Sequence, residues 1–361
     1  MKAVVLTGHG GMDKLEYHLD WPTPEPKQGE VQIKVGACGL NNTDINTRTA
    51  WYSKGVTEGI TDQGAEQGYR SADDADGGWG SSAVTFPRIQ GADVVGVVSA
   101  VGQGVDRSRI GQRILVDPWL LAPGDWMDPG RSRYLGSECD GGYAEFMIVP
   151  DDNAIAINSE YSDAELATFP CAYGTAENLV SKTALQPGET VVISGASGGV
   201  GSATIQLCKL RGARIVAIAS RSKSDFLMEL GAEAIIDRNE TDLAEKILDQ
   251  VNGSVDVALD VVGGYMFGPL VSVLRQGGRY STSGAISGPM VQFDLRQLVY
   301  KDLQLTGATI VPPGTMRRIV HLIEREKLKP ILAKTFLLQD LAKAQQAFQE
   351  KSHVGNIVVT V

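Results

Sequence analysis

The sequence predicts an α/β plus β protein in which a β-rich domain accompanies a domain built on a doubly wound parallel sheet. The chain has 361 residues, and single hydrophobic cores rarely grow beyond about 250–300 residues, so two domains are expected. Short strand patterns separated by glycines fill the first half, whereas strand and helix patterns alternate from about residue 160. Such alternation is typical of βαβ units with right-handed crossovers.

The first half contains short segments in which polar and apolar residues alternate, as in half-buried strands. The polar run Asn41–Asp44 offers capping side chains to a short helix. Predicted strands cover 2–7, 30–37, parts of 87–105, 111–116 and 142–149, with a loop at 117–139. Many short strands joined by glycine turns favour a barrel-like domain.

Residues 53–85 show neither a helical nor a strand period and carry an acidic cluster at 73–76. A loop insertion of this length inside a compact domain is often a lid or a binding loop. A solvated surface excursion is the alternative, and the sequence leaves both interpretations open.

The second half predicts strands at 191–193, 214–219, 234–236, 255–261 and 279–283, and helices at 163–169, 174–184, 202–210, 222–230, 242–251 and 265–274. The tail is mixed, with helices at 315–326 and 338–350 and a last strand at 356–361. We therefore assign 1–157 plus 300–361 to the β-rich domain and 158–299 to the α/β domain.

A glycine-dense turn between the strand at 191–193 and the following helix predicts a dinucleotide site. Glycines let the backbone approach the pyrophosphate, and the free N–H groups at the helix start point at the anion. The predicted binding residues are Gly195, Ala196, Ser197, Gly198, Gly199, Val200 and Gly201. A glycine-rich turn that binds nothing is the alternative.

The end of the second α/β strand indicates which dinucleotide is bound. NAD sites usually carry an acidic residue there, whereas this chain has Ser220, Arg221 and Lys223. No carboxylate is present to repel a 2′-phosphate, and the two cations and the hydroxyls of Ser220 and Ser222 could bind it, so NADPH is predicted as the cofactor. The alternative is that Arg221 and Lys223 only begin a solvated helix.

Composition excludes several classes of protein. The net charge of −10 argues against a nucleic-acid surface. The four cysteines form no C-x-x-C pair, which favours a reducing compartment. No apolar run is long enough for a membrane span or a signal peptide. We expect a cytoplasmic protein with a small-molecule substrate and neither a nucleic-acid nor a membrane partner.

The order of domains and a set of short motifs resemble the medium-chain dehydrogenase/reductase superfamily over nearly the whole chain. The motifs are Gly29–Val31, Ala37–Asn41, Gly91–Gly96, Gly111–Arg113, Gly141–Glu145, Ala196–Gly201 and Gly355–Val358. The resemblance implies a chaperonin-10-like β-barrel catalytic domain and a Rossmann domain, with the active site between them. It also implies a homodimer joined through edge strands of the Rossmann domain.

Within that superfamily the chain resembles the zinc-independent branch of quinone oxidoreductases and enoyl reductases. The resemblance puts Asn41, Ala92 and Cys171 where zinc alcohol dehydrogenases carry their catalytic zinc ligands. A catalytic zinc needs about three protein ligands, so no metal is expected. The four-cysteine structural zinc lobe is also missing.

Asn41 and Tyr52 match the asparagine and tyrosine of the zinc-independent branch in type and spacing, and both are the candidate catalytic residues. Hydride addition to an α,β-unsaturated carbonyl compound creates charge on the carbonyl oxygen, which a donor such as the Tyr52 hydroxyl stabilises. Asn41 would orient the substrate or the nicotinamide ribose. A packing role for Tyr52 and a helix cap at Asn41 are the structural alternatives.

The resemblance also marks segments near the nicotinamide, namely Thr175, Ser283, Gly284, Ala285, Thr309 and Asn356. Asn356 stands where a lysine is common, which removes one cation near the cofactor. The function expected is an NADPH-dependent reductase of activated C=C bonds or quinones. The alternatives are a carbonyl reductase or alcohol dehydrogenase, and a non-catalytic NADPH-binding protein.

Overall fold

The computed structural model describes residues 1–78, 83–122, 124–128, 130–251 and 253–361. Parts of the predicted loops 53–85 and 117–139, namely 79–82, Pro123 and Pro129, lie outside these residues. The chain forms two compact units. Unit 1 comprises Met1–Val56, Thr61–Cys171 and Pro312–Val361, and unit 2 comprises Thr57–Ile60 and Ala172–Val311. Within the described residues, no helix is long and apolar enough to cross a membrane.

Unit 1 is β-rich, as predicted. Its strands are β1 (Ala3–Leu6), β2 (Leu15–His18), β3 (Glu30–Gly39), β4 (Arg88–Ile89), β5 (Asp93–Val101), β6 (Arg113–Val116), β7 (Trp119–Leu120), β8 (Arg133–Tyr134), β9 (Phe146–Pro150), β10 (Ala154–Ala156), β17 (Leu332–Leu337) and β18 (Asn356–Thr360). A seven-stranded sheet runs in the order β10-β6-β5-β3-β18-β17, with β9 also paired to β3. Smaller sheets are β2-β1-β4 and β7-β8.

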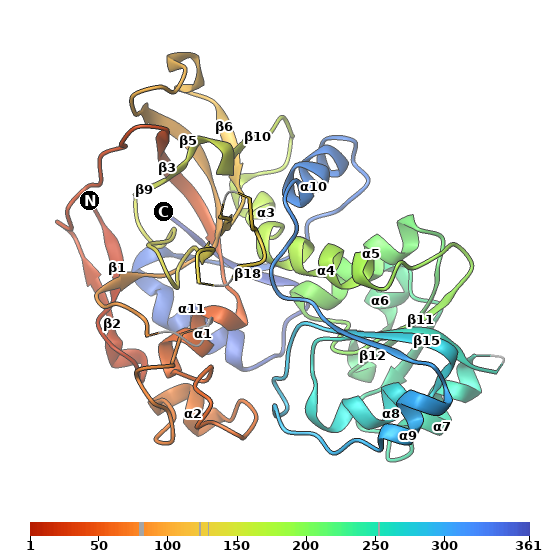
Figure 1. Ribbon diagram of the computed structural model, residues 1–361. Coiled ribbons are helices and arrows are strands. Elements are labelled where there is room, and N and C mark those ends of the chain that lie inside the picture. Colours follow the sequence, from red (N-terminus) through yellow and green to blue (C-terminus); the bar gives the residue numbers. More distant parts are fainter. Residues whose placement is uncertain (79–82, 123, 129, 252) are drawn as a thin grey trace. The chain divides into compact units, whose positions relative to one another are not determined.

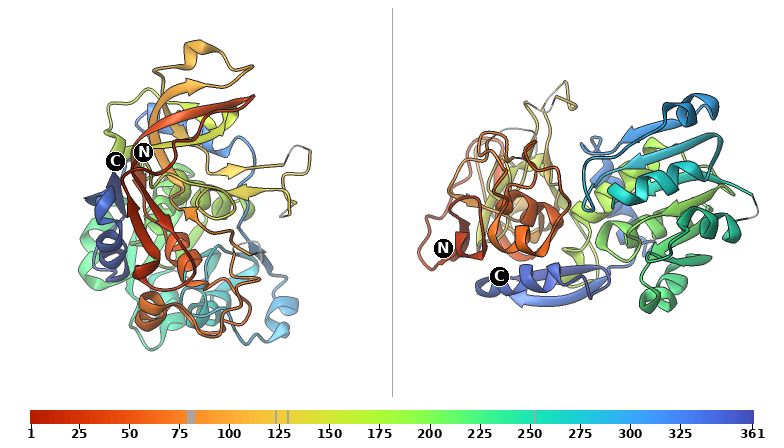
Figure 2. Two further views of the ribbon diagram at one scale, coloured as in Figure 1. Left: turned by 90° about the vertical axis from the view of Figure 1, so that its left-hand side faces the viewer. Right: turned by 90° about the horizontal axis from the view of Figure 1, so that it is seen from below.

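The chain's last strand, β18, pairs antiparallel with β3, so the C-terminal segment completes the sheet begun near the N-terminus. Figure 2 shows this segment in blue beside the red N-terminal strands. The helices of unit 1 are α1 (Asn42–Thr49), α2 (Asp62–Gln67), α3 (Asp163–Leu166), α10 (Thr315–Glu324) and α11 (Leu341–Gln349).

The 53–85 segment is more ordered than the sequence predicts, because it contains α2. The fully buried guanidinium of Arg48 donates to Ala65 O in α2, Gly10 O and Gln345 Oε1 at 2.7–2.9 Å. Burial lowers the pKa of Arg48 to about 10. This side chain holds α2 against α11 and the β1–β2 turn, contacts between segments too distant in sequence to show a local period.

Unit 2 is built on the predicted parallel sheet, here with six strands in the order β13-β12-β11-β14-β15-β16. The strands are β11 (Thr190–Ile193), β12 (Arg214–Ala219), β13 (Ala234–Asp237), β14 (Val255–Asp260), β15 (Leu274–Thr282) and β16 (Gln304–Gly307). The helices are α4 (Pro170–Lys182), α5 (Gly199–Leu210), α6 (Ser224–Leu230), α7 (Leu243–Gln250), α8 (Phe267–Ser272) and α9 (Leu295–Tyr300).

Apolar side chains pack on both faces of the six-stranded sheet. Val191 and Ile193 of β11 join a core with α4, α5 and α6, whereas Val192 joins a second core with α7 and α8. Figure 1 shows helices on each face. Because both faces of β11 are buried, its sequence is a continuous apolar run and does not alternate between polar and apolar residues. The fold class predicted from the sequence is confirmed.

The observed unit boundaries differ from the predicted ones at 157 and 299. β16 pairs with β15, which brings 304–307 into the parallel sheet, and α3 packs on β3 and β5, which keeps it in unit 1. The segment Thr57–Ile60 belongs to unit 2, where the Ile60 N–H donates to Ile286 O at 2.8 Å.

Candidate functional site

The glycine-rich loop of unit 2 lies where the sequence predicts it, between β11 and α5. Gly195 has φ +57°, a left-handed conformation that favours glycine, and Gly198 is the N-cap of α5. A Cβ on Gly201 would lie 2.3 Å from Gly195 O and 2.6 Å from Ala196 Cα. The loop and the first turn of α5 are therefore tightly packed, and the N–H groups at the helix start lack intrahelical acceptors. These features fit a pyrophosphate.

Other predicted cofactor residues follow the carboxyl ends of neighbouring strands in unit 2. Ser283–Ala285 come directly after β15, and Thr309 follows β16, where the Ala308 N–H donates to Thr282 O at 2.8 Å. Thr175 is half-buried in α4. Asn356 instead begins β18 in unit 1, where it is buried.

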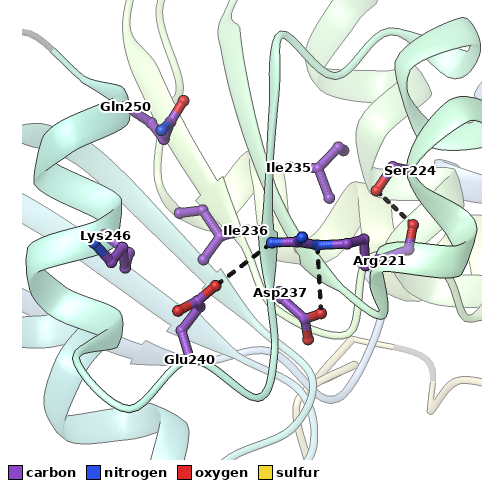
Figure 3. A pocket seen from close by; sticks show the side chains of 8 residues that line it. All are labelled: Arg221, Ser224, Ile235, Ile236, Asp237, Glu240, Lys246 and Gln250. Carbon is purple, nitrogen blue, oxygen red and sulfur yellow. Dashed lines mark hydrogen bonds and ion pairs between the residues drawn. The ribbon is translucent and has the colours of Figure 1, made fainter.

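The two predicted cations after β12 have different surroundings. The guanidinium of Arg221 lies 4.0 Å from an oxygen of Asp237 and 3.9 Å from one of Glu240, in a cavity of about 160 Å³ beside β13 (Figure 3). Lys223 is half-buried instead, and burial followed by repulsion from Arg238 lowers its pKa.

Arg238 is a third cation at the end of β12, and sequence reasoning missed it. Parallel pairing aligns Ala219 of β12 with Asp237 of β13, and the Arg238 N–H donates to Ala219 O at 3.0 Å. The register therefore brings Arg238 to the end of β12, next to Ser220. Arg238 lies beside Ser220 because β12 pairs with β13, and the sequence alone does not specify that pairing.

In unit 1, Asn41 holds together a buried acid cluster formed with Asp44, Asp93 and Tyr143. Asn41 is the N-cap of α1, and its N–H donates to Asp44 Oδ2 at 2.8 Å in a capping box. Its side-chain amide donates to Asp93 Oδ2 at 2.9 Å. The Tyr143 hydroxyl donates to Asp44 Oδ2 at 2.9 Å. The capping role considered for Asn41 is thus present, together with a contact to a second carboxyl group.

Both carboxyl groups of this cluster hold their protons more tightly than exposed ones. Burial raises the pKa of Asp93 to about 7, although hydrogen bonds from Asn41 and from the Cys171 N–H, at 2.6 Å, oppose the shift. Burial raises the pKa of Asp44 to about 6. Burial, followed by repulsion from these two carboxylates, raises the pKa of the Cys38 thiol well above its ordinary value, which keeps it protonated and unreactive.

Tyr52 follows the C-terminal end of α1 and folds back onto that helix. Burial raises the pKa of Tyr52 to about 12, and side-chain hydrogen bonds from Thr43 and Asn46 partly oppose the shift. Thr43 and Asn46 share a face of α1 because they are three residues apart. Trp51 packs against Tyr52 with ring centroids 5.8 Å apart. Tyr52 thus carries a protonated hydroxyl among polar neighbours, and sequence reasoning missed Thr43 as one of them.

Two protein families match the chain. Residues 27–159 match the family described as "Alcohol dehydrogenase GroES-like domain", and residues 199–325 match the family described as "Zinc-binding dehydrogenase". The first match agrees with the predicted chaperonin-10-like domain.

The residues present do not fit a catalytic zinc at the positions that the resemblance marks. Ala92 has no ligand atom, and the Asn41 amide donates to Asp93. Within the described ranges, no group of three or more His, Cys, Asp or Glu side chains could hold a metal ion.

Relatives of similar length match the chain from end to end. A solved structure from Sinorhizobium meliloti 1021, provisionally named an alcohol dehydrogenase, is 43% identical, covers 100% of this chain and 96% of its own, and has a TM-score of 0.88. Acryloyl-coenzyme A reductase of Metallosphaera sedula is 26% identical over 373 residues, covering 100% of both chains. The structure of CurK enoyl reductase is 26% identical, covers 99% of this chain and 98% of its own, and has a TM-score of 0.74.

A GroES-like domain, a six-stranded Rossmann sheet and a glycine-rich loop that fits a pyrophosphate thus occur in one chain, with relatives matched end to end. A nicotinamide dinucleotide is the cofactor typical of such proteins. The chain belongs to the medium-chain dehydrogenase/reductase superfamily of oxidoreductases.

Proposed function

We propose that this protein is an NADPH-dependent, zinc-independent reductase of activated C=C bonds in α,β-unsaturated carbonyl compounds, or of quinones. The observation that carries the proposal is the donor set around α1: the hydroxyl groups of Tyr52 and Thr43 and the amide of Asn41, the residue that the resemblance puts at a zinc-ligand position. The relatives named acryloyl-coenzyme A reductase and enoyl reductase support the choice of acceptor.

NADPH, when bound, supplies the hydride. The chain must then stabilise the negative charge that develops on the carbonyl oxygen of the acceptor and deliver a proton to the α-carbon. The Tyr52 hydroxyl suits this task because its pKa of about 12 keeps the proton in place at neutral pH. Thr43 and Asn46 hold the phenol oxygen, which makes them positioning residues.

Asn41 has a second amide hydrogen besides the one donated to Asp93, since a carboxamide carries two. We propose that this hydrogen orients the substrate or the nicotinamide ribose. Asp93 then acts through Asn41, because its carboxyl group sets the direction of the Asn41 amide.

For the cofactor, we propose that Lys223 and Arg238 hold the 2′-phosphate of NADPH. An anion placed between two neighbouring cations is attracted by both of them. Burial, followed by repulsion from Arg238, lowers the pKa of Lys223, and the repulsion places the two cations near each other, which supports this choice. Arg221 contributes less, because Asp237 and Glu240 already lie beside its guanidinium.

The test measures NADPH and NADH oxidation with enones, quinones, acryloyl thioesters and ketones. We expect turnover with enones, thioesters or quinones, and for Tyr52→Phe a fall in kcat of about 10- to 100-fold. Turnover with ketones alone would instead support a carbonyl reductase, which the provisional name of the Sinorhizobium relative favours. Tight NADPH binding without any turnover would favour a non-catalytic NADPH-binding protein. Metal analysis that finds zinc, with activity lost in chelator, would contradict zinc independence.

A further inference from the structure

Asp260 is the last residue of β14, is fully buried, and accepts four hydrogen bonds. Its Oδ1 accepts from the Val262 and Gly263 N–H groups at 2.8 and 3.1 Å, and also from the Ser194 hydroxyl. Its Oδ2 accepts from the Tyr280 hydroxyl at 2.7 Å. Buried carboxylates need such donors in place of water, so this set explains how the group is accommodated.

The donors come from the ends of three adjacent strands. Ser194 directly follows β11 and precedes Gly195 of the glycine-rich loop, and its hydroxyl also accepts a hydrogen bond from the Val261 N–H at 3.1 Å. Tyr280 lies in β15, the strand that leads to Ser283–Ala285. The Ser283 N–H donates to the backbone oxygen of Asp260 at 3.1 Å. Asp260 thus joins the pyrophosphate loop, its own loop and the segment expected at the nicotinamide.

These three loops also touch one another closely. A Cβ added to Gly284 would lie 2.7 Å from Val261 O, and one added to Gly263, at φ +66°, would lie 2.8 Å from Ala285 Cα. Gly195 is as close, since its Cβ would lie 2.7 Å from Val261 Cγ2. A small change in the hydrogen bonds that join Ser194 and Tyr280 to Asp260 would therefore change the distances between the loops.

We propose that Asp260 is a positioning residue that sets the spacing between the pyrophosphate loop and the segment Ser283–Ala285. A dinucleotide binds through two joined ends, and joining them increases affinity only when both sites are held at the matching separation. The inference rests on the dinucleotide part of the proposed function and not on the identity of the acceptor.

The test compares a ligand with both ends against one that lacks the nicotinamide. NADPH and 2′-phospho-ADP-ribose are titrated by calorimetry into the full-length wild type, Ser194→Ala and Tyr280→Phe. Each variant removes one hydroxyl that donates to Asp260 and leaves the carboxylate in place. Thr183→Val is the matched control, because it removes a buried hydroxyl of unit 2 that donates to Val180 O at 2.8 Å, before β11 begins.

We expect the Kd of NADPH to rise about tenfold or more in both variants, while the Kd of the fragment changes less than about threefold. The control should leave both values unchanged. An equal rise in the Kd of both ligands would contradict the positioning role, since a general loss of structure affects both ligands alike. An unchanged Kd for NADPH would contradict it as well. If the wild type binds NADPH but reduces no acceptor, the proposed reductase function is wrong. The Kd values of NADPH and of the fragment would still test the positioning role of Asp260.

Discussion

Asp93 is a fully buried carboxyl group that accepts hydrogen bonds from two neutral donors, the Asn41 amide and the Cys171 N–H. Burial raises its pKa to about 7 from the ordinary 3.8. Between about pH 4 and pH 7 the folded protein therefore keeps a proton that the unfolded chain releases. Stability must fall as the pH rises through this window, by about 1.4 kcal/mol for each pH unit.

The variant Asp93→Asn removes this titration and gives a direct measurement. All five tryptophans lie between residues 21 and 126, so their fluorescence reports unfolding of unit 1 in urea. The free energy of unfolding of the wild type, relative to Asp93→Asn, should decrease from pH 5 to pH 7 by about 2–3 kcal/mol and then level off. A difference that stays constant over this range would show that Asp93 ionises at its ordinary pKa.

Lys223, Arg238 and Arg221 provide a second prediction for single residues. A charge-assisted hydrogen bond is worth about 1.5–3 kcal/mol, so Lys223→Ala and Arg238→Ala should each raise the Kd of NADPH about tenfold or more, with little change for NADH. Arg221→Ala should change the Kd of NADPH by less than about threefold, because its guanidinium already faces Asp237 and Glu240. Dinucleotide titrations of the three variants check this order. Equal losses for NADPH and NADH would contradict a 2′-phosphate site.

Among the elements, the turn from β11 into α5 contains glycines with different roles. A Cβ on Gly201 would meet backbone atoms at 2.3 and 2.6 Å, whereas a Cβ on Gly198 would meet nothing closer than 3.6 Å. Gly201→Ala should therefore lower the melting temperature and abolish dinucleotide binding together. Gly198→Ala should keep the melting temperature and weaken binding, because the added methyl group intrudes only on an approaching pyrophosphate. Scanning calorimetry and NADPH titration separate the two effects, and equal melting temperatures would contradict the packing argument.

The sequence predicts the strongly periodic elements and fails where pairing decides the structure. The buried run of β11 and the helix α5 follow from local pattern, but β16 has the short, half-exposed pattern of Gln304–Gly307 and forms because it pairs with β15. The same holds for the site. Asn41 and Tyr52 are candidates because they match the spacing of the zinc-independent branch, but Asp93 reaches Asn41 only because the register of β3 and β5 pairs it with Gly39. Such neighbours depend on long-range register, which one sequence does not specify.

For the whole molecule, the open edge of the six-stranded sheet bears on the oligomeric state. Within the described ranges β16 is the last strand of that sheet, and an open edge strand presents unpaired backbone groups. Large apolar side chains are exposed just before it, with Leu295 66%, Val299 63% and Tyr300 73% exposed. Surfaces of this kind often mark protein interfaces. We propose that a second copy of the chain covers this edge and forms a homodimer.

Light scattering coupled to size exclusion tests the homodimer. The wild type should have twice the 38.5 kDa mass of one chain, whereas the double variant Leu295→Glu, Val299→Glu should have the monomer mass, because two buried carboxylates at an interface cost several kcal/mol. Leu337→Glu is the control, since Leu337 is 57% exposed on β17, at the end of the unit 1 sheet. If Leu337→Glu has the monomer mass and the double variant the dimer mass, the interface lies at β17 and not at β16. A wild type with the mass of one chain would contradict the proposed homodimer.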